Sequence, residues 1–209
     1  MKKRTMRTMI TALLAAVLCL GLVACSGEDF DAAGYVKSVL DANYHKEYKG
    51  YATFRQLSEE EAEKEIVDSI NLQLELDLAA VGGITEEGKE SYKELSAEID
   101  KLAKYEVTEA KKQDDGSYIV TVSVEPSNVF QIMEQVLTDV ANEMMGQGAT
   151  LESDEDFTEY LLEGMRRCID QNAYGEAQTV KVAVSADDSG AYGISEEDMQ
   201  LLQDTMFPE

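Results

Sequence analysis

The chain has 209 residues, and its 42 Asp and Glu outnumber its 18 Lys and Arg, which leaves a formal charge of −24 at pH 7. So acidic a protein repels the phosphates of nucleic acids, and a nucleic-acid partner is therefore excluded. The length suits one domain with its own hydrophobic core, and three Cys are too few for a disulfide-rich scaffold.

The first 24 residues are organised like a secretory signal. Four cations, Lys2, Lys3, Arg4 and Arg7, precede an uncharged and mainly apolar run over 10–23. A basic start, a short apolar stretch and small residues at the cleavage point are typical of such signals. The run is shorter than the roughly 20 residues that a helix needs to cross a bilayer, which disfavours a permanent transmembrane anchor.

The signal ends in Leu22-Val23-Ala24-Cys25. This tetrapeptide resembles the bacterial lipobox, Leu-x-Ala-Cys. The resemblance implies cleavage before Cys25, recognition of Leu22, Val23 and Ala24 by the peptidase, and a diacylglycerol on the Cys25 thiol. It also implies a location on the extracytoplasmic face of the cell membrane. The alternative is an ordinary signal peptide in which the cysteine occurs by chance.

Cleavage before Cys25 would divide the chain into a signal (1–24), a lipidated cysteine with a short tether (25–29) and a single domain (30–209). It would remove four cations and no acid, leaving a formal charge of −28. We expect this charge to keep the domain off an anionic membrane surface except at its lipid. A role in keeping the protein soluble is enough to explain the charge. Cys168 would remain as the one free thiol, so no intramolecular disulfide is expected.

Three helices are predicted in the first half of the domain. Val36, Leu40 and Tyr44 lie four residues apart in the first, which the pattern extends over 31–48 with an end at Lys49 and Gly50. The second begins at a capping box, in which Ser58 and Glu61 have the required spacing. The third begins at Thr85 and has a buried stripe.

The apolar period then changes from 3.6 to two. Alternating residues from Tyr105 and again from Tyr118, on either side of an Asp-Asp-Gly turn, predict a β-hairpin, and Pro126 ends it. Helices are predicted from Asn128 and from Ser153.

A second hairpin follows over 180–194, and a closing helix over 195–207. The element order predicts an α+β fold with about six helices and two β-hairpins. These hairpins form a mainly antiparallel four-stranded sheet on which the helices pack.

The residues that carry chemistry do not form a recognisable catalytic set. His45 is the single histidine, so a histidine metal cluster is excluded, and a surface position near a helix C-terminus is expected. Cys168 falls on an apolar helix face and is expected in the core. The acidic runs lack the spacing of a calcium loop and lie at predicted helix starts and turns, where carboxylates are locally stabilising. No metal or cofactor site is therefore predicted.

Four tyrosines gather near the start of the domain: Tyr35, Tyr44, Tyr48 and Tyr51. Tyrosine is common at surfaces that are both apolar and wet, which makes these four a candidate partner surface. The alternative is that they pack an amphipathic helix onto the sheet.

The stretch from Asp31 to Ala42, which contains Tyr-Val-Lys and Leu-Asp-Ala, is followed by Tyr44, Tyr48 and Ser58-Glu-Glu-Glu-Ala. It resembles a group of uncharacterised small lipoproteins of Gram-positive anaerobes. The resemblance implies a location and no activity, and it carries over no functional residue except Cys25.

Together these patterns predict a lipid-anchored envelope lipoprotein that acts as a non-enzymatic binding or interaction module. Its expected partners are the membrane, through the lipid, and an envelope protein or a small ligand. The alternatives are a hydrolase acting on cell-envelope material and a lipoprotein that binds a small ligand or a cation. The hydrolase would require a cleft that gathers carboxylates of raised pKa.

Overall fold

A computed structural model describes residues 30–188 and 190–209, so the predicted signal and Cys25 lie outside the described residues. The described chain is an α+β fold, as predicted, with helices at both ends of the described residues and a sheet formed by two hairpins. The α-helices are α2 (Ala32–Leu40), α3 (Tyr48–Arg55), α4 (Glu59–Val81), α5 (Glu86–Asp100), α6 (Met133–Gly146), α7 (Asp154–Asp170) and α8 (Glu196–Met206). Among the described residues, no helix is both long enough and apolar enough to cross a bilayer.

The sheet has four antiparallel strands in the order β1-β2-β3-β4, which confirms the predicted topology. The strands are β1 (Tyr105–Lys112), β2 (Tyr118–Val124), β3 (Gln178–Ala186) and β4 (Tyr192–Ile194). Val120 lies opposite Val182 and Val122 opposite Val180, and all four are buried. Buried residues alternate with partly exposed ones along β2. One face of the sheet is therefore covered by the rest of the protein, and the other faces solvent.

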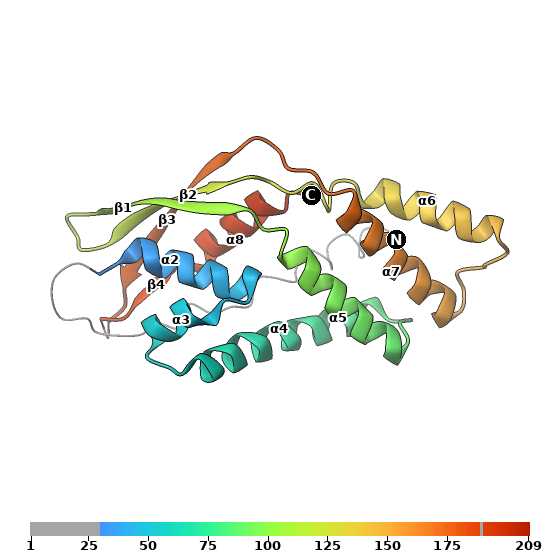
Figure 1. The fold of residues 1–209 in the computed structure, drawn as a ribbon, viewed down its shortest axis with the longest axis horizontal. Helices are drawn as coiled ribbons and strands as arrows, with labels where there is room; N and C mark the ends of the chain where they lie inside the picture. Colours follow the sequence, from blue (N-terminus) through green and yellow to red (C-terminus); the bar gives the residue numbers. More distant parts are fainter. Residues whose placement is uncertain (1–29, 189) are drawn as a thin grey trace.

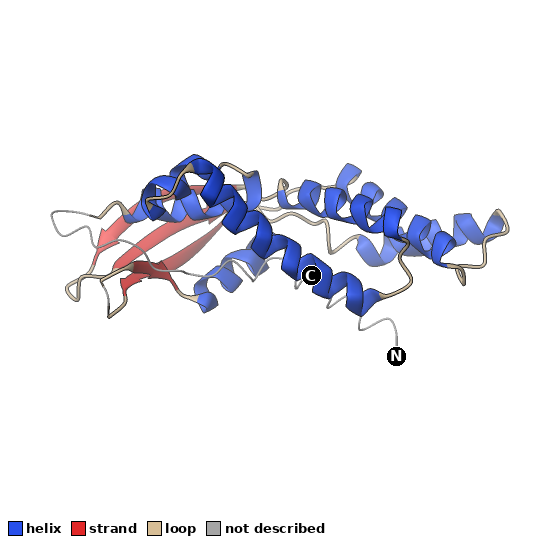
Figure 2. Cartoon of the chain, turned by 90° about the horizontal axis from the view of Figure 1, so that it is seen from below, coloured by secondary structure: helices blue, strands red, loops and turns tan. Residues whose placement is uncertain are grey.

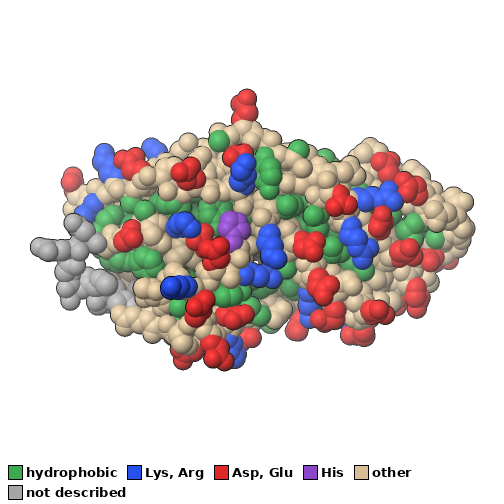
Figure 3. Space-filling view, in the orientation of Figure 1, with side chains coloured by type: hydrophobic (Ala, Val, Ile, Leu, Met, Phe, Trp, Pro, Cys, Tyr) green, Lys and Arg blue, Asp and Glu red, His purple; other side chains and the backbone are tan. Residues whose placement is uncertain are grey.

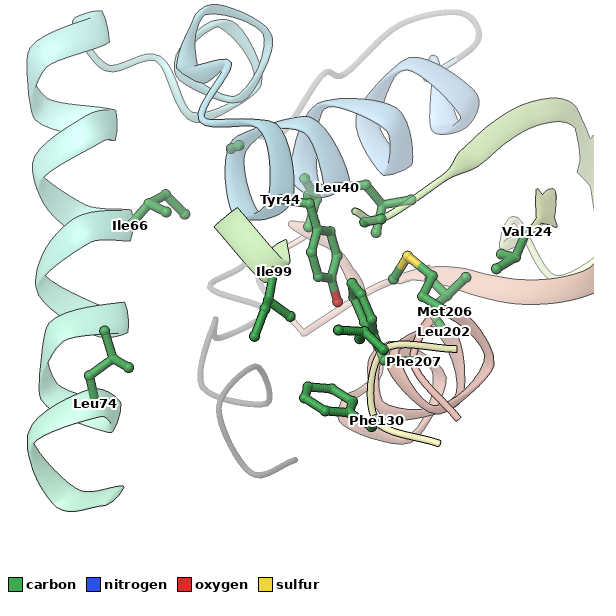
Figure 4. Packing of buried hydrophobic residues seen from close by; sticks show 14 of the residues in the cluster. Leu40, Tyr44, Ile66, Leu74, Ile99, Val124, Phe130, Leu202, Met206 and Phe207 are labelled. Carbon is green, nitrogen blue, oxygen red and sulfur yellow. The ribbon is translucent and has the colours of Figure 1, made fainter. Parts of the chain in front are cut away.

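The molecule is elongated, with the sheet at one end and the α6–α7 pair at the other (Figures 1 and 2). α2 packs on β1 and β2, and α8 packs on β2 and β3. α5 connects the two ends because it packs against α7 while its last turn leads into β1. Figure 4 shows part of the hydrophobic core. Ile66 and Leu74 of α4 face it from one side, and Leu202 and Met206 of α8 lie on the other.

Serine and threonine caps fix four helix starts where the sequence places them. Ser58 accepts a hydrogen bond from Glu61 N while the Glu61 carboxylate accepts one from Ser58 N, which completes the predicted capping box. Thr85, Ser153 and Ser195 cap α5, α7 and α8 in the same way. α6 begins later than predicted, because a turn over 129–132 precedes it.

The predicted first helix is divided, which corrects its expected end at Lys49 and Gly50. After α2 the chain makes a π-helical turn, η2 (Asp41–His45), and Lys46 then takes a left-handed conformation with φ of 60°. α3 begins at Tyr48, so Lys49 and Gly50 lie inside a helix. Gly50 serves close packing, because a Cβ there would lie 3.0 Å from Ser38 Cβ on α2.

An aromatic cluster holds the beginning of the described chain against the sheet. The ring of Phe30 stacks on Tyr192 of β4, with centroids 4.1 Å apart and planes 10° apart. It also contacts Tyr118 at the start of β2, Tyr35 of α2 and Phe54 of α3, with centroids 5.6–6.0 Å apart. Phe30 is therefore fixed at the end of the sheet where the hairpin turns lie.

β1 is an edge strand with an irregular register. Its pairing with β2 shifts between Val107 and Glu109, which leaves Thr108 as a bulge. The Thr108 hydroxyl donates to the Thr121 carbonyl at 3.2 Å. Lys111 and Lys112 are exposed at the hairpin end of this strand.

Candidate functional site

The π-turn η2 brings together the only histidine, a tyrosine and a carboxylate. The Tyr105 hydroxyl lies 2.9 Å from Asp41 Oδ1 and 3.2 Å from His45 Nδ1. His45 Nε2 lies 3.0 Å from the Ala103 carbonyl oxygen, which can only accept a hydrogen bond. Nε2 therefore carries a proton. Figure 3 shows the imidazole at the surface with cationic and acidic side chains around it.

If the imidazole is neutral, the single hydroxyl hydrogen of Tyr105 has two possible acceptors, Asp41 Oδ1 and His45 Nδ1. Tyr105 then donates to either Asp41 or His45 Nδ1, and one contact is left without a hydrogen. If His45 is protonated at both nitrogens, Nδ1 donates to the Tyr105 oxygen and Tyr105 donates to Asp41, so every contact is satisfied. Burial raises the pKa of Tyr105, and the Asp41 carboxylate raises it further, so Tyr105 stays a phenol and a donor.

A second carboxyl lies inside the protein next to this turn. Asp100, at the end of α5, is only 2% exposed, and burial raises its pKa to about 7, although the Lys46 cation acts in the opposite direction. Burial also raises the pKa of the Tyr44 hydroxyl, and the carboxylates of Asp100 and Asp204 add to this effect. The turn thus has a polar outer side at His45 and a buried acid beneath it.

A separate group of buried polar atoms lies between α4 and α5. Asp77 Oδ2, Tyr92 Oη and Ser96 Oγ have no hydrogen-bond partner among the described residues, and all three side chains are more than nine-tenths buried. Gln73 donates to the other Asp77 oxygen at 3.0 Å. Burial raises the pKa of Asp77 and raises that of Tyr92 to about 12.

Two surface hollows are lined by other residues. One of about 370 Å³ lies at the C-terminus between Phe130, Gln203 and Phe207. Another, of about 380 Å³, lies between α5 and α7 and is lined by charged residues that include Glu94 and Arg166. Neither of these two hollows is lined by His45, Tyr105 or Asp41.

The four tyrosines predicted as a candidate partner surface lie in the interior. Tyr35, Tyr44, Tyr48 and Tyr51 are 6%, 2%, 7% and 3% exposed. They pack α2, η2 and α3 against the core, which is the alternative role that the sequence offered for them. Tyr51 also donates to Glu65 of α4 at 3.1 Å. A partner would therefore meet other side chains.

The remaining candidate residues are placed as follows. Cys168 is fully buried, as predicted, and burial raises the pKa of its thiol to about 11. Leu22, Val23, Ala24 and Cys25 lie outside the described residues. Within the described ranges, no group of three or more His, Cys, Asp or Glu is arranged to hold a metal ion.

Three structural features were not predicted from the sequence: the Asp41–Tyr105 contact, the burial of Asp100, and the exposure of two leucines on α4. The Asp41–Tyr105 contact joins residues 64 apart, and Asp100 reads as one more acid at a helix end. Leu72 and Leu76 of α4 are 62% and 59% exposed, since they lie off the stripe that faces the core. The sequence signal for the exposed leucines was their spacing of four residues, which places both on one face of the helix.

Comparisons with known proteins identify no family. No protein-family model matches the chain, and no curated protein matches it. Among solved structures, it is similar to one from Bacillus subtilis subsp. subtilis str. 168 that is described as a candidate lipoprotein, ycdA, with a TM-score of 0.57 and 14% identity. The match covers 86% of this chain and 56% of that one, so the chain spans little more than half of its length. At this identity the likeness shows a shared fold.

Proposed function

We propose that the protein is a lipoprotein held on the extracytoplasmic face of a cell membrane by a diacylglycerol on Cys25. The lipobox-like sequence over 22–25 carries this proposal. The shared fold with a solved structure described as a candidate lipoprotein supports it, as does the resemblance to small lipoproteins of Gram-positive anaerobes. Two acyl chains on one residue are enough for stable anchoring.

The domain that follows acts in this proposal as a non-enzymatic binding or interaction module for an envelope protein or a small ligand. The polar side chains at η2 bond to one another, and the acid with the most clearly raised pKa, Asp100, is enclosed. A hydrolase for envelope material would need such an acid in an open cleft. Small-ligand or cation binding is the second candidate, and the oxygen atoms between α4 and α5 favour it.

The anchor is tested by feeding an alkyne-tagged fatty acid to bacterial cells that make the wild type, Cys25→Ala or Cys19→Ala. We expect the label and the membrane fraction to be lost only in Cys25→Ala, because Cys19 lies within the signal. Cys19→Ala is the matched control, since it removes a neighbouring thiol outside the lipobox. Labelled, membrane-bound Cys25→Ala would show that the cysteine occurs there by chance.

A further inference from the structure

The aromatic cluster around Phe30 fixes which end of the molecule lies near the point of anchoring. Phe30 contacts Tyr118 and Tyr192, the first residues after the two hairpin turns. The chain between Cys25 and Phe30 has five residue steps and cannot span more than about 18 Å even when fully extended. A lipid on Cys25 would therefore lie within that reach of the hairpin end.

The opposite end lies much farther away. β2 leads from its hairpin turn toward the middle of the molecule, and α6 continues along the same long axis to the far end (Figure 1). Seven strand residues span about 23 Å and 14 helical residues about 21 Å. The turn at Asp114 and the end of α6 at Gln147 are therefore roughly 45 Å apart, more than twice the reach of the tether.

Acidic residues predominate on α4, along one side of the molecule, and on α6 at its far end. α4 has eight acids and one Lys, and α6 has three acids and no cation. These helices repel an anionic lipid surface. The hairpin end is acidic as well, because Asp114, Asp115, Asp187 and Asp188 of the two turns outnumber Lys111 and Lys112. The reach of the tether, and not charge, therefore places this end next to the membrane.

We propose that the anchored protein stands on end, with the turns of its two β-hairpins facing the lipid headgroups and the α6–α7 pair held away from the membrane. This inference rests on the proposed lipid at Cys25. It makes the α6–α7 end, together with the exposed Leu72 and Leu76 of α4, accessible to a partner from the outside.

The orientation is tested with the lipidated full chain in vesicles of phosphatidylcholine and phosphatidylglycerol that contain an energy-accepting lipid in the outer leaflet. Asp114→Cys and Gln147→Cys each place one fluorophore at one end, on exposed residues. Cys25 is blocked by lipid and Cys168 is buried with a raised thiol pKa, so only the introduced thiol takes the label. The wild type, carried through the same labelling, is the control for this selectivity.

We expect energy transfer to the lipid to be severalfold greater from position 114 than from position 147, at equal recovery of both proteins with floated vesicles. Equal energy transfer from two floated proteins would overturn the orientation, since the molecule would then lie on its side. The lipid anchor would still be supported, because both proteins float with the vesicles. Failure of both proteins to float, when their thermal unfolding matches the wild type, would overturn the lipid anchor and with it the orientation. The two failures are therefore distinguishable.

Discussion

The imidazole of His45 lies flat against the ring of Tyr105, with centroids 5.1 Å apart and planes 9° apart. The same tyrosine donates its hydroxyl hydrogen to Asp41 at 2.9 Å. β1 is thereby attached to η2 by stacking and by hydrogen bonds, at residues that are far apart in sequence. The stability of this attachment is measurable.

Replacing Tyr105 with Phe keeps the stacked ring and removes the hydroxyl that contacts Asp41 and His45. We expect the free energy of unfolding to fall by about 1–3 kcal/mol, because the lost acceptor is a carboxylate in a partly buried site. Urea denaturation measures the change. The matched control is Tyr174→Phe, which removes an exposed hydroxyl bonded to the Leu102 carbonyl. An equal loss of unfolding free energy in both variants would show that the η2 contacts stabilise the protein no more than an exposed hydrogen bond does.

The buried carboxyl of Asp100 makes stability depend on pH. Its pKa is raised to about 7 in the folded protein, against an unfolded value near 3.8, so the folded state binds more protons between these values. Stability therefore falls as pH rises from about 4 to about 7. Asp100→Asn should remove this fall and become the more stable protein at pH 7, by roughly 2–4 kcal/mol.

Thermal unfolding of the wild type and of Asp100→Asn at several pH values measures the difference between the two. Asp114→Asn, at an exposed turn, controls for the loss of one negative charge. A constant difference between Asp100→Asn and the wild type from pH 4 to 8 would refute the raised pKa.

Removing the buried Tyr92 hydroxyl, unlike removing that of Tyr105, should not lower the stability of the protein. Tyr92 Oη makes no hydrogen bond of good geometry among the described residues, and the nearby Ser96 hydroxyl offsets its desolvation only in part. Tyr92→Phe should leave the free energy of unfolding unchanged or raise it by about 1 kcal/mol. A clear loss of stability in urea denaturation would indicate instead that a water molecule or a cation bridges Tyr92 to Asp77 and Ser96.

The contact between α5 and α7 leaves no room for a methyl group at Gly88. A Cβ there would lie 2.2 Å from Thr158 Cγ2, and the Thr158 hydroxyl is held by a hydrogen bond from Thr85 N at 3.0 Å. Gly88→Ala should therefore destabilise the protein by about 1–3 kcal/mol. Gly146→Ala is the control, because no atom lies within 4 Å of its Cβ, and it should be neutral or stabilising. Similar melting temperatures for both would refute the tight contact.

Cys168 should be almost inert in the native protein. Its pKa of about 11 lowers the thiolate fraction a few hundredfold relative to a free thiol, and burial blocks the reagent as well. Reaction with a chromogenic disulfide at pH 8 measures this, and the thiol of Gln147→Cys gives the exposed reference rate. A native Cys168 that reacts as fast as that reference would contradict its core position.

Local patterns predicted much of the fold. Alternation in β2 and β3, the turn sequences and the Ser58–Glu61 box placed strands, turns and helix starts correctly, because each rests on neighbours in sequence. The break after α2 was missed because left-handed Lys46 has no sequence signal, and glycine in α3 resembled a helix end. The polar contacts of His45 and the burial of the four tyrosines depend on which elements meet, and periodicity alone does not specify this.

Anchored proteins diffuse in two dimensions, where neighbouring copies meet often and in the same orientation. An open strand edge is dangerous under such crowding, because it invites pairing with the same edge of another copy. The Thr108 bulge interrupts the ladder of β1, and Lys111 and Lys112 place two cations at its end. In the proposed anchored state, this irregular, charged edge should keep neighbouring copies of the protein from pairing through their sheets.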